Sequence, residues 1–441
     1  MKTWNEILQL VEDEDVEFIR LQFTDMFGTL KNMAVTARQL ARIKDKGYGF
    51  DGSCMYGNFK VGEEDMYLSP DLDTFAILPW RPQQGKVARL LCDVCIADGA
   101  RLQESPREIL RKVVQQAGEE GYTFHVDPEV EFFLFHTDEN DIPTTVTYEQ
   151  AGYMDISPLD MGENARRDMV LTLEEMGFEI ESSHHEAAPA QHEIDFKYAK
   201  PLETADRIVT FKTAVRSIAK RFGLHATFMP KPRPGVAGSG MHIHFSVYKD
   251  GRNIFSDPES VDGLSEEARW FMGGIVEHAK AMCAVTNPLV NSYKRLISGQ
   301  GELRDLSWTT KRRNALLRVP SMRGEETRIE LRFPDPSSNP YLTLALCMAA
   351  GLDGIARRLD RGSEAEDRSG SCSGFKETFS EARQLPETLG EAVSCMEQNS
   401  FVKHILGEDF VRWYTEAKRA EWNEYMSQVS EWEIEKYLYR M

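Results

Sequence analysis

The sequence predicts an α+β fold, with a small N-terminal sheet domain in residues 1–104 and a larger domain of strands and helices in residues 105–441. Two observations support this division. Short strand-like runs separated by turns fill the first hundred residues, whereas longer amphipathic helices alternate with strands beyond them. A helix start, Ser105-Pro106-Arg107-Glu108, marks the junction, because it offers Ser as N-cap and Pro at the first helical position.

The expected elements follow from local patterns. Turns at Phe27-Gly28-Thr29 and Asp98-Gly99 separate the N-terminal strands. A helical period of 3.6 predicts the longer helices, and Ser, Gly and acidic residues predict a loop over 361–375. The predicted strands are Val16–Thr24, Leu30–Val35, Phe75–Leu78 and Val87–Val94; the predicted helices are Thr204–Phe222, one from Asn339-Pro340 to about Leu359, and a helical tail from about Leu389 that ends in Glu431–Tyr439.

Composition excludes several classes of protein. Hydrophobic residues make up 41% and charged residues 28%, which is typical of a globular protein. The net charge of −19 and the scattered Lys and Arg argue against a nucleic-acid partner. No apolar run approaches the roughly 20 residues of a membrane span, and residues 1–16 lack the apolar core of a signal peptide. We therefore expect a cytoplasmic protein with no membrane partner.

Four predicted strands carry polar side chains two residues apart. Side chains on a strand repeat every two residues, so Glu129 and Glu131 share one face, as do His242 and His244. An isolated pair of this kind is usually a solvated face. However, Glu131 leads into Phe132–Phe135, and an unpaired charge among such neighbours is costly. The four segments are Val126–Phe135, His184-His185-Glu186 with Gln191–Phe196, Gly238–Phe245, and Arg328–Arg332.

These residues predict a metal-dependent phosphoryl-transfer site. Five carboxylates with one histidine suit hard cations, Mg²⁺ or Mn²⁺, better than zinc. Arginines concentrate between residues 295 and 332, and their guanidinium groups suit carboxylate and phosphate. The chain contains no P-loop motif, and the glycines at 235–240 do not fit a dinucleotide-binding turn. A two-metal hydrolase would use the same carboxylates, but it would not need so many arginines.

At these positions the sequence closely resembles type I glutamine synthetases of the short kind found in Gram-positive bacteria. The resemblance runs almost end to end, and several long motifs lie in register. They include Phe50-Asp51-Gly52-Ser53, Asp65–Leu68, Ser183–Glu186, Gln191-His192-Glu193, Gly238–His242, Asn291–Leu296, and Arg328–Arg332 before Pro334-Asp335-Pro336.

The resemblance implies a fold, an assembly and an activity. The fold would be an N-terminal β-grasp domain and a catalytic domain with a curved antiparallel sheet and surrounding helices. Twelve subunits would form two hexameric rings, with each site at a subunit boundary. ATP would convert the γ-carboxylate of glutamate to γ-glutamyl phosphate, and ammonia would displace phosphate to give glutamine. A non-catalytic regulatory relative is a further alternative, although the metal positions are intact.

The resemblance also assigns roles by position. Glu131, Glu186 and Glu193 match the ligands of one metal, and Glu129, His242 and Glu330 those of the other. Arg295, Arg313 and Arg332 match residues that hold glutamate and the transferred phosphoryl group, with Gly238 and Tyr153 on the substrate side. Glu181, His244, Ser246, Arg318 and Arg328 match nucleotide contacts. Asp51 matches the residue that helps to deprotonate ammonium across the boundary, with Tyr153 and Glu186 nearby.

Three departures concern the nitrogen nucleophile. The family's flap glutamate falls at Gly301, with Glu302 one residue later. Cys54 replaces a serine, and Ala237 replaces an asparagine. A lost acceptor weakens selection for a small cation. Either Glu302 serves in place of the missing glutamate, or a larger amine is the nucleophile and the product is a γ-glutamylamide.

Overall fold

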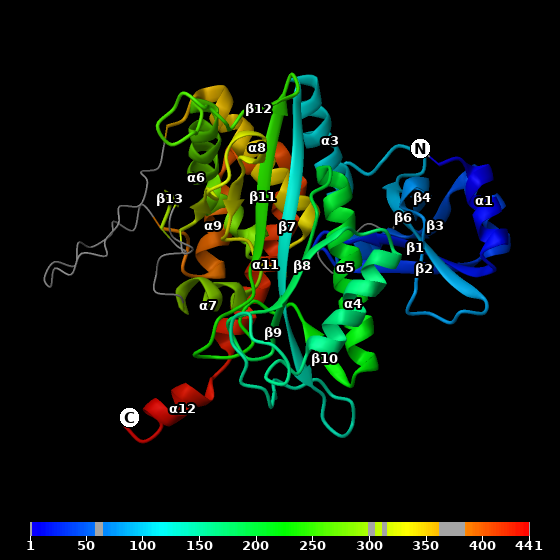
Figure 1. Cartoon of the computed structure of the whole chain (residues 1–441), viewed down its shortest axis with the longest axis horizontal. Helices are drawn as coiled ribbons and strands as arrows, with labels where there is room; N and C mark the ends of the chain where they lie inside the picture. The colour runs from blue at the N-terminus through cyan, green and yellow to red at the C-terminus, as the bar shows by residue number, and fades with distance from the viewer. Residues whose placement is uncertain (1, 58–64, 299–304, 311–314, 361–383, 441) are drawn as a thin grey trace, which may run out of the picture.

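The N-terminal domain is a twisted sheet flanked by two short helices. The structure is a computed structural model that describes residues 2–57, 65–298, 305–310, 315–360 and 384–440. Strand order in the first sheet is β2-β1-β6-β4-β3, with β5 joined to β6. In Figure 1 this domain stands to one side of the larger body. Its elements are α1 Trp4–Asp13, β1 Val16–Thr24, β2 Leu30–Thr36, α2 Leu40–Lys46, β3 Tyr48–Asp51, β4 Asp65–Pro70, β5 Ala76–Ile77 and β6 Lys86–Cys95.

The predicted β-grasp domain is confirmed. β1 pairs antiparallel with β2 and parallel with β6, so a hairpin and a returning strand share one sheet. All four predicted strands are present, although the third is shortened to β5. β3 and β4 were not predicted from the sequence. Gly49 breaks the apolar alternation of β3, and Pro70 ends β4, which weakens the strand pattern of both.

A nine-stranded sheet forms the centre of the large domain. Its order is β13-β14-β15-β11-β7-β9-β8, with β10 joined to β7 and β12 to β11. The sheet was expected to be antiparallel, but it is mixed, because β13 and β14 run in the same direction. The long strands β7 and β11 lie side by side at its centre (Figure 1). The strands are β7 Tyr122–His136, β8 Ile180–His185, β9 Gln191–Phe196, β10 Leu224–Thr227, β11 Met241–Lys249, β12 Arg252–Asn253, β13 Trp308–Thr309, β14 Leu317–Arg318 and β15 Ile329–Leu331.

Helices pack around this sheet. The helix predicted from Thr204 begins three residues earlier, at Pro201, whose fixed φ suits the first turn. Asn339 caps α8 as expected, since its side chain accepts from Tyr341 N, whereas Ser105 occupies the cap position of α3 without a side-chain bond. The helices are α3 Pro106–Glu119, α4 Glu163–Glu175, α5 Pro201–Arg221, α6 Glu266–Thr286, α7 Val290–Ser298, α8 Pro340–Arg357, α9 Leu389–Gln398, α10 Ser400–Leu406, α11 Glu408–Ser427 and α12 Glu431–Tyr437.

Arg107 joins the two domains through a buried charge network. Its Nε and Nη2 lie 3.0 and 2.8 Å from the two carboxylate oxygens of Asp206 on α5. Nη1 lies 2.6 Å from Asp93 Oδ1 of β6, and Nη2 lies 2.7 Å from Asp71 Oδ2. The guanidinium therefore links the N-terminal sheet to the helices of the large domain.

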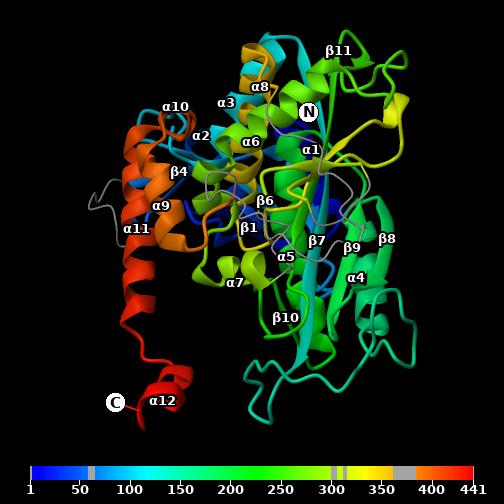
Figure 2. The same ribbon diagram turned by 90° about the vertical axis from the view of Figure 1, so that its left-hand side faces the viewer.

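The C-terminal helix stands away from the rest of the chain. α12 projects beyond the body in both views (Figures 1 and 2) and keeps Trp432, Ile434 and Tyr437 exposed. It confirms the predicted helical tail. None of the helices in the described part of the chain is long and apolar enough to cross a membrane. The loop predicted over 361–375 lies outside the described residues.

Candidate active site

Five adjacent strands bring the polar pattern of the sequence into one row. Antiparallel neighbours project directly opposed side chains to the same face of a sheet. The strand order β15-β11-β7-β9-β8 therefore turns four separate sequence motifs into one surface. The opposed pairs are Glu330 with His244, His242 with Glu129, Glu131 with Glu193, and Glu193 with His184.

Glu129, His242 and Glu330 form the first cluster of this row. Each offers one ligand atom, and these atoms all lie within 4.8 Å of one another. Glu129 Oε2 lies 3.0 Å from His242 Nδ1, and its Oε1 lies 2.8 Å from His244 Nε2. Burial disfavours the charged form of Glu129, but the bonds to His242 and His244 outweigh it and lower its pKa. The resemblance assigns these three residues to one metal, and the structure brings them together.

Glu131 and Glu193 belong to a second group of carboxylates. Glu131 Oε2 accepts hydrogen bonds of 2.8 Å from both Gln191 Nε2 and Gly240 N. Burial and the charges of Asp195 and Glu131 raise the pKa of Glu193 to about 12. Burial also raises the pKa of Glu131. These carboxylates repel one another without a positive charge between them.

His184 connects Glu186 to this second group. Its Nε2 lies 3.0 Å from Glu186 Oε1 and 3.7 Å from Glu193 Oε1. A ligand atom from each of His184, Glu193 and Asp195 also lies within 4.8 Å of the others. The bond to Glu186 raises the pKa of His184 despite burial. Of the three residues expected on one metal, Glu131 lies opposite Glu193 on the neighbouring strand. The imidazole of His184 lies between Glu193 and Glu186.

The donor set fits divalent cations that prefer oxygen. Five of the six expected ligands are carboxylates, and only His242 contributes nitrogen. Mg²⁺ and Mn²⁺ prefer such donors, whereas a structural zinc site would use more sulfur and nitrogen. Burial and the neighbouring carboxylates raise the pKa of Glu193, so the charged form of this residue is disfavoured. Bound cations would remove that penalty.

Arginines border the row on the β15 side. Arg318 Nη1 lies 2.7 Å from Glu330 Oε2, and Arg332 Nη1 contacts Glu330 Oε1. Glu330 is fully buried. Burial disfavours its charge, but His244 and Arg332 outweigh it and lower its pKa. Two guanidinium groups therefore meet at one carboxylate of the first cluster.

Two of the residues expected to contact nucleotide, His244 and Arg328, lie beside Asp127, to which the sequence assigned no role. Arg328 Nη1 lies 3.9 Å from Asp127 Oδ2. Burial raises the pKa of Asp127 to about 6. The charge of His244 acts against this rise, and the charge of Glu181 adds to it. Ser246, two residues after His244 on β11, donates from its hydroxyl to the Thr327 carbonyl at 3.3 Å.

Arg295 extends from α7 towards the row and packs against the loop that contains Gly238 and Gly240. Its Nη1 and Nη2 donate to the carbonyls of Phe333 and Arg332, both at 2.9 Å. A Cβ at Gly240 would lie 2.5 Å from Arg295 Nη2, and one at Gly238 would lie 2.3 Å from the Pro230 carbonyl. A side chain at Gly238 would therefore collide with backbone, and one at Gly240 would displace the guanidinium of Arg295.

The remaining expected residues are divided between three places. Tyr153 lies edge-on to His184, with ring centroids 5.5 Å apart, and is 43% exposed. Asp51 ends β3 in the other sheet, where its exposed Oδ1 accepts from Ser53 N at 2.9 Å. It does not join the row within this chain. Arg313, Gly301 and Glu302 lie outside the described residues.

Comparison with family sequences decides the classification. The family description "Glutamine synthetase, catalytic domain" matches residues 103–437, and "Glutamine synthetase, beta-Grasp domain" matches residues 15–97. The chain belongs to the glutamine synthetase family. Membership makes it an ATP-dependent ligase that uses divalent metal, and it supports the joining of ammonia to glutamate.

Individual relatives agree over nearly the whole chain. A glutamine synthetase from Clostridium saccharobutylicum is 53% identical over 436 residues, which is 99% of this chain and 98% of that protein. Glutamine synthetases from Methanosarcina mazei and Staphylococcus aureus are each 46% identical, with the same coverage. A solved structure described as "Apo GmaS without ligand" superposes with a TM-score of 0.86 at 32% identity and covers 98% of this chain and 99% of its own.

Four residues of the row were not assigned a role from the sequence. Asp127, His184, Gln191 and Asp195 all contact or neighbour assigned residues. Asp127 and Asp195 stand two residues from Glu129 and Glu193, so the strand period already placed them on the same face. Gln191 precedes Glu193 by the same interval, and its role as a donor to Glu131 depends on the pairing of β7 with β9.

Proposed function

We propose that this row is the active site at which ammonia is joined to the γ-carboxylate of glutamate. The observation that carries the proposal is the meeting of Arg318 and Arg332 at Glu330, beside the cluster of Glu129 and His242. Carboxylates to hold cations and arginines to hold anions are the two requirements of phosphoryl transfer.

The proposed reaction has two steps. A γ-carboxylate oxygen of glutamate attacks the γ-phosphorus of ATP, ADP leaves, and ammonia then displaces phosphate from γ-glutamyl phosphate. Arg295 and Arg332 hold the glutamate and the transferred phosphoryl group together with Arg313, and Gly238 and Tyr153 complete the substrate side. Mg²⁺ or Mn²⁺, when bound, would neutralise charge on the phosphates. Glu131, Glu186 and Glu193 would hold one ion, and Glu129, His242 and Glu330 would hold the other.

On the nucleotide side we assign Glu181, His244, Ser246, Arg318 and Arg328. His244 and Arg328 lie beside Asp127. Arg318 contacts Glu330 at the β15 edge of the row, whereas Tyr153 meets His184 at the β8 edge, which supports a separate nucleotide side and amine side. Asp51, with Glu186, assists deprotonation of ammonium. Because Asp51 belongs to the N-terminal sheet, the proposal places it in the site of a neighbouring subunit in a dodecamer of two hexameric rings.

The domains are residues 1–104 and 105–441, the protein acts in the cytoplasm, and it has no nucleic-acid partner. A larger amine in place of ammonia remains the second candidate. The departures at Gly301, Cys54 and Ala237 favour it, whereas the 46–53% identical relatives favour ammonia.

An amine panel tests the proposal. Glutamate-dependent phosphate release is measured with ammonium, methylamine, ethanolamine and polyamines. We expect ammonium to give the highest kcat/KM. A higher value with an alkylamine would establish the second candidate. No glutamate-dependent release of phosphate from ATP with any amine would contradict both.

A further inference from the structure

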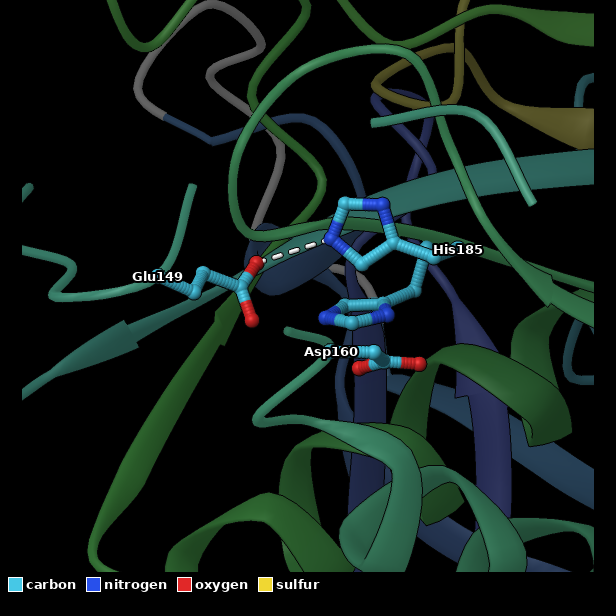
Figure 3. A group of neighbouring side chains, drawn as sticks. Glu149, Asp160 and His185 are labelled. Atoms are coloured by element: carbon cyan, nitrogen blue, oxygen red, sulfur yellow. Dashed lines mark hydrogen bonds and ion pairs between the residues drawn. The ribbon is translucent and has the colours of Figure 1, made fainter. Parts of the chain in front are cut away.

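A second cluster of titratable residues lies behind the active-site row. His185 follows His184 at the end of β8 and precedes Glu186. His192 alternates with Gln191 and Glu193 on β9, so His185 and His192 point to the opposite face of the sheet. Figure 3 shows the Glu149 carboxylate directed at His185, with Asp160 on the other side of the group. Glu149, Asp160, His185 and His192 are all buried, and their ligand atoms lie within 4.8 Å of one another.

This cluster has the composition of a metal site, but Arg166 excludes that reading. Arg166 Nη1 lies 2.9 Å from His192 Nδ1 and 2.8 Å from Asp160 Oδ2. Arginine only donates, so Nδ1 of His192 is the acceptor and the proton of the neutral ring sits on Nε2. A protonated Nε2 cannot bind a cation. Gly162 packs closely against that atom, since a Cβ there would lie 2.5 Å from it.

The cluster instead ties a long loop to the back of β8. His185 Nε2 lies 2.8 Å from Glu149 Oε1, and its Nδ1 lies 3.0 Å from the Gly152 carbonyl and 2.7 Å from the Glu186 carbonyl. Met154 N donates to the His185 carbonyl at 2.9 Å. Both chain neighbours of Tyr153 are therefore bonded to one histidine, on the face opposite to the one where Tyr153 meets His184.

Glu149 holds this arrangement through three bonds. Besides His185, it accepts from Ala190 N with Oε1 and from Met161 N at 2.9 Å with Oε2. Each carboxylate oxygen thus faces a backbone N–H, and Glu149 ties the middle of the loop to its last turn and to the turn before β9. Met154 has a φ of 62°, a left-handed conformation that a non-glycine residue keeps only under restraint.

From this geometry we infer that Glu149 is a positioning residue for the amine side of the active site, acting through His185 on Tyr153 and Glu186. The inference rests on the proposed assignment of Tyr153 and Glu186 to that side. Glu149 touches no substrate. It fixes the backbone that presents Tyr153 and Glu186, and a displacement of about 1 Å in such groups is enough to weaken a site substantially.

The test uses Glu149→Gln in the assembled enzyme. A glutamine has one acceptor oxygen, so its NH₂ group must face the N–H of either Ala190 or Met161, and the loop loses a fixed position. We expect KM for ammonium, or for the best amine of the panel, to rise about fivefold to twentyfold, with KM for ATP within about twofold of the parent. Glu139→Gln, an exposed position on the same loop, is the matched control and should behave as the parent.

A double-mutant cycle separates positioning from a general structural role. Tyr153→Ala should raise the same KM. Because Glu149 acts in part through Tyr153, the rise in the double variant should be smaller than the product of the two single effects. If Tyr153→Ala has no effect, the assignment of Tyr153 fails. If the effects of Tyr153→Ala and Glu149→Gln on KM for ammonium simply multiply, Glu149 does not act through Tyr153. If Glu149→Gln raises KM for ATP as much as KM for ammonium, its role is general and not one of positioning.

A milder variant tests the inference if Glu149→Gln does not fold. Glu149→Asp keeps the charge and withdraws the carboxylate by one methylene. It should show the same selective rise in KM to a smaller degree. If neither variant yields assembled protein, the cluster maintains the fold and not the site, and the inference is overturned.

Discussion

Glu131 of β7 and Glu193 of β9 lie directly opposite each other, two buried carboxylates on one face of the central sheet. Like charges in this relationship destabilise a sheet. Burial and the charge of Glu186 raise the pKa of Glu131, and burial with the charges of Asp195 and Glu131 raises the pKa of Glu193. A cation between them would reverse the effect, so the pair links the stability of the fold to metal binding.

The first prediction is that Glu131→Gln separates stability from activity. The amide oxygen can still accept from Gln191 and Gly240, while one negative charge is removed. Without divalent cations, the variant should be more stable than the parent by about 1 kcal/mol. Mg²⁺ should raise the Tm of the parent much more than that of the variant, and glutamate-dependent ATP turnover should fall by at least about a hundredfold.

Thermal unfolding with chelator and with Mg²⁺ measures both effects, with Glu175→Gln on the exposed surface of α4 as control. Near-parental activity, or an unchanged response of Tm to Mg²⁺, would remove Glu131 from the metal site. Lower stability in chelator would show that repulsion from Glu193 is not the dominant effect.

A second prediction concerns the junction of the domains. Arg107→Met leaves Asp206 and Asp93 without their shared guanidinium in a buried place. Removal of one partner from such a network typically costs about 3–5 kcal/mol. We expect earlier unfolding in urea and a shorter half-life on heating. Arg167→Met, whose side chain is 68% exposed, should be nearly neutral. A similar small effect from both variants would show that Asp93 and Asp206 find other partners.

The third prediction is the pH dependence of that network. Burial opposes the charge of Asp93, but Arg107 and Arg111 outweigh it and lower its pKa below the ordinary 3.8. A lowered folded pKa gives stability that is fully present above the unfolded value and is lost as pH falls through the folded one. The difference in Tm between the parent and Arg107→Met should therefore be constant from about pH 6 to 8 and shrink below about pH 4. A difference that grows on acidification would contradict the ion-pair explanation.

Much of the site followed from local spacing, because the two-residue period of a strand fixes which side chains share a face. It predicted the common faces of Glu129 with Glu131 and of His242 with His244. The order of the strands could not be read in this way. The contact of Arg318 with Glu330 requires β14 beside β15, although the two strands are eleven or more residues apart. The network of Glu149 and Arg166 depends on a loop and a helix that pack behind β8 and β9. No local pattern in the sequence therefore predicts it.

A fourth prediction tests the subunit boundary. Asp51→Asn and Glu330→Ala should each be nearly inactive, because they damage the two halves of the proposed site. When the two proteins are co-assembled from an unfolded mixture, roughly a quarter of the boundaries should contain both intact halves in a random ring. Activity should return to a comparable fraction of the parent. Proven hetero-oligomers without any recovery would place Asp51 outside the neighbouring site.

The last prediction addresses the choice of nucleophile at Gly301 and Glu302, which lie outside the described residues. If Glu302 supplies the acceptor that the family places one residue earlier, Glu302→Ala should raise the KM for ammonium steeply and leave the KM for ATP unchanged. Loss of a charged acceptor for a cation typically costs about 1.5–3 kcal/mol, which is tenfold to more than a hundredfold. If the pocket suits an alkylamine instead, Glu302→Ala should matter little with ammonium.

The reverse substitution provides the complementary measurement. Gly301→Glu adds charge and fills space, so it should favour ammonium over larger amines. Steady-state kinetics of both variants, with ammonium and with the best amine of the panel, distinguish the two cases. An unchanged ratio of kcat/KM for the two nucleophiles in both variants would show that this loop does not select the amine. The choice would then lie with Tyr153, Glu186 and the residues that hold them, because these are the described groups at that end of the row.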